Sequence, residues 1–71
     1  MALMEVSTES TMRREEAAAR LREIADMLER HNQLEFSREG LRFTVDVADE
    51  VTVEFELEVG DENELEIEIR W

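Results

Sequence analysis

The sequence contains no cysteine, which excludes disulfide bonds, thiolate metal ligands and a thiol nucleophile. Its single histidine, His31, has no second histidine or cysteine with which to hold a metal, and without a general base the serines are not activated as nucleophiles. Two glycines, Gly40 and Gly60, are too few for a phosphate-binding loop. We therefore expect no enzyme, no cofactor and no dedicated metal centre.

Lysine is also absent. All eight basic residues are arginine, against twenty acidic residues, sixteen of them glutamate, and the net charge is −12. Phosphate binding requires clustered basic side chains, so nucleic acid is not an expected partner. Such an acid excess destabilises a compact chain by self-repulsion, but in molar salt the Debye length is only about 3 Å and the repulsion is screened. The charge predicts a salt-adapted, halophilic protein; the alternative is an acidic binding face.

Long apolar runs are missing as well. No segment approaches the roughly 18 apolar residues of a transmembrane helix, and residues 1–6 lack the basic and apolar regions of a signal peptide. These features predict a soluble, cytoplasmic protein with no membrane partner. The length of 71 residues predicts one domain, residues 1–71, of a size whose small core is often supplemented by oligomerisation.

Residues 13–31 have the pattern of one amphipathic helix. Apolar side chains recur at spacings of three and four and form a single stripe: Ala17, Ala18, Leu21, Ile24, Ala25 and Leu28. Ser10 or Thr11 is the expected N-cap, and the acidic Glu15 and Glu16 suit the first turn. His31 and Asn32 are the expected exit from the helix.

The period changes to two outside this helix. Residues 2–9 alternate weakly and predict a short first strand, and residues 34–36 could add another. Within 41–47, 51–59 and 65–71, apolar residues hold the odd positions and polar residues the even ones. The expected fold is α+β: one amphipathic helix packed on a mainly antiparallel sheet of about four strands, in the order β-α-β-β-β, with a C-terminal β-meander.

The apolar face of such a sheet is too wide for its cover. A helix about 10–12 Å across does not hide four strands spanning about 19 Å. The uncovered surface predicts self-association, most simply as a homodimer. The candidate interface residues are Trp71, Ile69, Ile67, Phe55, Val53 and Phe43. Trp71 has two interpretations: it fills the gap between sheet and helix, or it anchors the interface.

Glutamates at the even strand positions form a second candidate surface. If the last hairpin pairs simply, they share a face at ~4.8 Å across the strands, where two charges repel by about 1 kcal/mol in water. We expect a solvated, cation-screened face; the alternatives are divalent-cation binding and the docking of a basic protein partner. The residues are Glu54, Glu56, Glu58, Glu64, Glu66 and Glu68. The predicted role is a small homo-oligomeric interaction or structural module, and the alternative is an acidic adaptor that uses this face.

The last two strands also carry a family resemblance. The stretch from Val51 to Val59 (VTVEFELEV), a short turn and LEIEIRW at 65–71 resemble the C-terminus of the amphi-Trp family, and residues 14–29 are similar to its helix. That family comprises small acidic proteins, frequent in halophilic archaea and named for amphipathic strands that end in tryptophan. Where a Pro-Asp-Glu-like turn is expected before the third strand, this chain has Ala48, Asp49 and Glu50. The resemblance implies an α+β fold, dimers and no established activity.

Overall fold

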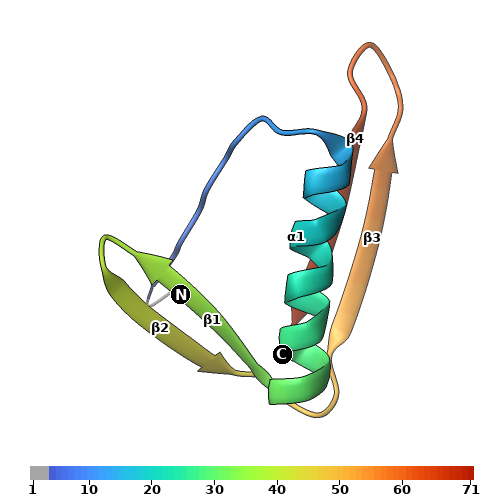
Figure 1. Ribbon diagram of the computed structural model, residues 1–71. Coiled ribbons are helices and arrows are strands. Elements are labelled where there is room, and N and C mark those ends of the chain that lie inside the picture. Colours follow the sequence, from blue (N-terminus) through green and yellow to red (C-terminus); the bar gives the residue numbers. More distant parts are fainter. Residues whose placement is uncertain (1–3) are drawn as a thin grey trace.

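The computed structural model describes residues 4–71 as a helix followed by two β-hairpins (Figure 1). The elements are α1 (Arg14–Asp26), a π-helical turn η1 (Met27–His31), β1 (Gln33–Arg38), β2 (Leu41–Asp46), β3 (Thr52–Glu58) and β4 (Glu64–Arg70). Residues 4–13 form an arm without regular secondary structure, which spans the space between the start of α1 and β1 (Figure 1). The α+β class and the helical segment are confirmed.

The helix begins without a side-chain cap. Arg13 occupies the N-cap position in an extended conformation, and no side chain hydrogen-bonds to the amides of the first turn. The prediction of Ser10 or Thr11 as N-cap is wrong, because both precede the residue at which the backbone enters the helix. At the other end, Asn32 has a φ of 53°, the left-handed conformation that commonly terminates helices, as expected for the exit.

The first hairpin, β1–β2, closes through a two-residue turn. Glu39 and Gly40 have φ values of 51° and 80°, and the type I′ turns favoured in tight hairpins require a positive φ at both positions. Since side chains alternate across the pleat, the antiparallel register puts the apolar residues on one face. That face consists of Leu34, Phe36, Leu41, Phe43 and Val45, with Arg38 at its end.

The second hairpin, β3–β4, has the same division of faces. Its antiparallel register pairs apolar with apolar and glutamate with glutamate. The apolar pairs are Val53–Ile69, Phe55–Ile67 and Leu57–Leu65; the acidic pairs are Glu54–Glu68, Glu56–Glu66 and Glu58–Glu64. In the loop, the backbone N–H of Gly60 donates to Asn63 Oδ1 at 3.3 Å. The simple pairing assumed for the glutamates is therefore confirmed.

The strands are arranged differently from the single sheet expected. They form two separate two-stranded sheets, β1–β2 and β3–β4, because β2 and β3 do not pair. The pairing of β1 with β2 continues for one residue, where the backbone N–H of Val47 donates to the Asn32 carbonyl at 2.9 Å, and the chain then bends at Asp49 and Glu50. The expected first strand at 2–9 is not seen in its described part, residues 4–9, while residues 2 and 3 lie outside the described range. The described order is thus α-β-β-β-β.

The described chain has no enclosed core. No residue among 4–71 is buried; the least exposed are half-buried, and include Ala18, Leu28, Leu34, Phe43 and Ile69. The radius of gyration is 13.9 Å, whereas a compact domain of this length has about 11 Å. The two hairpins point away from a common base, and their apolar faces stay largely open to solvent (Figure 1).

Candidate interaction surfaces

The tryptophan at the end of β4 joins the two hairpins. The Trp71 indole Nε1–H donates a 2.8 Å hydrogen bond to the Asp46 backbone carbonyl at the end of β2. A buried indole N–H needs such an acceptor, and this one ties the base of β4 to the base of β2. Trp71 as a whole is nevertheless 48% exposed. Trp71 therefore fills the junction between the hairpins and still presents surface to the outside.

The other candidate interface residues are exposed to different extents. Ile69, near the base of β4, is half-buried. Phe43, within the β1–β2 face, is also half-buried. Val53 and Ile67 are both 43% exposed, and Phe55 is 71% exposed. The structure brings the five residues on β3, β4 and their C-terminal end together on one hairpin, and leaves Phe43 on the other hairpin.

Three exposed residues near the tip of the β3–β4 apolar face were missed by the sequence reasoning. Leu57 and Leu65, an opposed pair near the tip, are 68% and 63% exposed, and Val59 beyond them is 78% exposed. The signal was available, because Leu57 and Leu65 share the odd parity of Phe55 and Ile67. We call Phe55, Leu57 and Leu65 the distal face.

The opposite face of this hairpin carries the six glutamates, with Thr52 and Arg70 at its base. Among residues 4–71, Arg70 is the basic residue that forms ion pairs with these glutamates: its Nη1 lies 2.9 Å from Glu68 Oε1 and 3.4 Å from Glu54 Oε2. These contacts, first with Glu68, raise the pKa of Arg70 above its ordinary value. Toward the tip no basic side chain alternates with the glutamates. There Glu64, by hydrogen bonding and then by like charge, raises the pKa of Glu66, and Glu56 adds to the effect.

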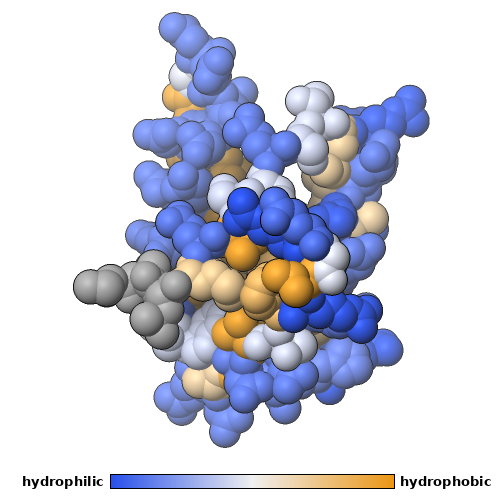
Figure 2. Space-filling view, turned by 90° about the vertical axis from the view of Figure 1, so that its left-hand side faces the viewer, coloured by the Kyte–Doolittle hydropathy of each residue, from blue (hydrophilic) through white to orange (hydrophobic). Residues whose placement is uncertain are grey.

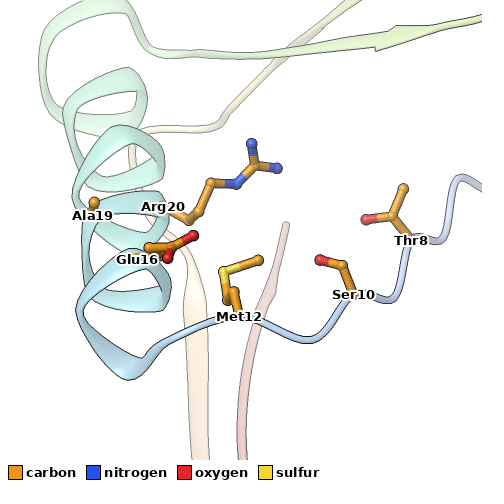
Figure 3. A pocket seen from close by; sticks show the side chains of 6 residues that line it. All are labelled: Thr8, Ser10, Met12, Glu16, Ala19 and Arg20. Carbon is orange, nitrogen blue, oxygen red and sulfur yellow. The ribbon is translucent and has the colours of Figure 1, made fainter.

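Two hollows lie on the side of α1 that faces the arm and β1. The larger, of about 480 Å³, lies between the arm and the first turns of α1, and Figure 3 shows the Arg20 side chain extending from the helix into it. The second, of about 350 Å³, lies between α1 and β1. We call it the α1–β1 groove; its apolar lining is Val6, Ile24, Met27, Leu34 and Phe36, and Arg20 also borders it.

Hydrophobic side chains reach the surface on this side of the molecule. Figure 2 shows them in the middle of the face that lies to the left in Figure 1, bordered by hydrophilic side chains. Among residues 4–71, no group of three or more histidine, cysteine, aspartate or glutamate side chains is placed to hold a metal ion. None of the helices described in this range has the length and apolar character needed to cross a membrane.

Comparison with known proteins identifies a family. The sequence model of the Amphi-Trp domain matches residues 1–71, the whole chain. The chain therefore belongs to the Amphi-Trp domain family, as the resemblance of its strands and helix indicated. No curated protein and no solved structure matches it.

Proposed function

We propose that this Amphi-Trp domain is a self-associating interaction module in which a second copy completes the hydrophobic core. The observation that carries the proposal is that a chain with regular, amphipathic elements has no buried residue in its described part, 4–71. An amphipathic helix or sheet is stable only when its apolar side is covered by another element. Here the elements are well formed while their apolar sides are not covered.

The area left open supports a partner of substantial size. The chain exposes 7124 Å², whereas a folded monomer of this mass exposes about 4,600 Å². The excess is about 2,500 Å² per chain, which exceeds the roughly 800 Å² that each partner contributes to a standard interface and matches a large obligate one. A homodimer offers this area with matching apolar faces, and two-fold closure is the commonest symmetry.

The charge supports a high-salt working environment for this module. Association concentrates acidic side chains further, and a net charge of −12 on each copy opposes it. Molar salt reduces the Debye length to about 3 Å and removes most of this opposition. We therefore place the module in a salt-rich cytoplasm, as a binding or structural component without catalytic activity.

The solution mass tests the proposal. Sedimentation equilibrium and light scattering in 2 M KCl should give a species of at least twice the chain mass of 8.4 kDa across the micromolar range. Trp71→Ala, measured beside the wild type, should shift the equilibrium toward the monomer, because the exposed part of the indole contributes contact area. A wild-type monomer at all concentrations would overturn the proposal.

A second candidate function is that of an acidic adaptor for a basic protein partner. The specific observation is the imbalance on the polar face of β3–β4, where six glutamates are served by Arg70 alone. A basic surface would relieve the repulsion between the opposed carboxylates. Capture of one stoichiometric basic partner in 2 M salt would support this role. Titration with Ca²⁺ or Mg²⁺ at matched ionic strength distinguishes this adaptor role from divalent-cation binding. Only a cation-binding face would raise the melting temperature beyond the effect of ionic strength.

A further inference from the structure

We infer that, in the self-associated form proposed above, the distal face of each β3–β4 hairpin occupies the α1–β1 groove of the other copy. The inference rests on the proposed function and adds the two surfaces that meet. Each chain carries one projecting apolar tip and one apolar groove, and both are open in the described part of the chain.

The exposure along the hairpin shows which part the chain covers by itself. Near the base, Ile69 is half-buried and its opposed partner Val53 is 43% exposed. Toward the tip, the distal face is 63–71% exposed. In Figure 1 the loop of this hairpin extends beyond the start of α1. The chain's own elements thus shield the base of the apolar face and leave its distal half for another molecule.

The groove has the size and lining to receive such a tip. Its volume of about 350 Å³ falls within the roughly 300–1,000 Å³ of protein sites that enclose a ligand. Ile24 on α1 and Phe36 on β1, which line opposite walls, are 42% and 43% exposed. Filling the groove would cover both walls and the distal face in one contact, since each is apolar.

Charge decides between this contact and a direct meeting of two tips. No basic residue stands between Arg42 and Arg70, while Asp61 and Glu62 in the loop add to the glutamates around the tip. Two such tips in contact would repel each other, because like charges across an interface are unfavourable. A tip placed at the groove instead meets arginine.

Arginine is available at the groove without breaking an existing pair. Arg20 borders it and makes no ion pair with any residue in the range 4–71. Arg38 lies at the end of β1 on the same face as Phe36. Of the two acidic residues that line the groove, Glu35 is engaged by Arg42 at 3.3 Å and Glu23 is the other. Arg20 therefore offers the acidic tip a cation beside the apolar lining of the groove, and Glu23 is the one groove carboxylate without an ion pair among residues 4–71.

Symmetry makes the contact self-limiting. When each copy inserts its tip into the groove of the other, the two contacts are equivalent and a two-fold axis closes the pair. The distal face and the groove of each chain are then each used once, and no open filament results.

Cross-linking between single-cysteine chains tests the geometry, since the natural chain has no cysteine. Leu57→Cys and Phe36→Cys chains are co-refolded in 2 M KCl and treated with a short bismaleimide; circular dichroism confirms folding. We expect covalent dimers in the mixture and none from Leu57→Cys alone. A covalent dimer formed by Leu57→Cys alone would overturn the inference, because it would place two tips side by side. So would the absence of covalent dimers from a mixture that sediments as a dimer. Either result would leave self-association intact. A wild-type monomer would overturn the proposed function instead.

Charge reversal gives an independent test. Arg20→Glu should raise the dimer dissociation constant at least tenfold in 0.5 M KCl, because it replaces the cation at the groove by a charge of the same sign as the tip. Arg22→Glu is the matched control, because at 100° per residue Arg22 points to a different side of α1 and does not line the groove. Equal effects of Arg20→Glu and Arg22→Glu would contradict the contact.

Discussion

Replacing Trp71 with alanine should remove a large part of the stability of this domain. A fully buried tryptophan removes about 150–250 Å² from water, and Trp71 is 48% exposed, so about 100 Å² is at stake. At roughly 25 cal/mol per Å² this contributes about 2.5 kcal/mol, and the hydrogen bond to the Asp46 carbonyl adds about 0.5–1 kcal/mol. We expect the free energy of unfolding to fall by about 3 kcal/mol, out of on the order of 4–10 kcal/mol for a chain of this length.

The assay is urea unfolding in 2 M KCl, followed by far-ultraviolet circular dichroism because the variant lacks the only tryptophan. Protomer concentration is held fixed, since association contributes to the measured stability. Trp71→Phe is the matched control: it keeps most of the apolar contact and loses the N–H donor, so it should lose only about 1 kcal/mol. A loss below 0.5 kcal/mol for Trp71→Ala would refute the role of Trp71 as the tie between the hairpins.

Three further predictions concern charge and turn geometry. Dilution from 2 M to 10 mM KCl should lower the melting temperature, because the Debye length grows to about 30 Å and the glutamates repel one another; an unchanged melting point by circular dichroism would contradict this. Glu66→Gln should raise the melting temperature at pH 7. A raised pKa means that the folded state binds the proton more readily than the unfolded state, so the penalty develops as pH rises through the window from about 4.3 to the raised pKa. The gain should vanish below about pH 4, and equal gains at both pH values would speak against the assignment. Glu39→Asn should stabilise the first hairpin by about 0.5–1 kcal/mol, because asparagine tolerates the positive φ of 51° better than glutamate; urea unfolding measures it, and a destabilised variant would argue against the type I′ turn.

Much of the local structure could be predicted from the residues. The helix follows from apolar spacings of three and four, and Asn32 marks its end as expected. The acidic face of β3–β4 follows from the strict alternation of glutamate with apolar residues, which predicted that the glutamates of the two strands share one face.

The sequence predicted that an apolar and an acidic surface exist, but not how much of the apolar surface is exposed. The apolar face of the last hairpin was expected to be open, yet the exposure gradient from Ile69 to Leu57 depends on which elements lie over each position. The α1–β1 groove has no sequence signature, because it is made of residues from the arm, the helix and β1, whose distances the sequence does not state.

The sequence by itself determined the period of each segment and therefore which side chains share a face, because helix and strand geometry are local and repeat every 3.6 and 2 residues. Only the tertiary structure decided that β2 and β3 separate into two sheets and that Trp71 reaches Asp46. These are contacts between distant parts of the chain. They depend on how the segment between β2 and β3 bends and on what covers each apolar face, and neither is encoded in a repeating pattern.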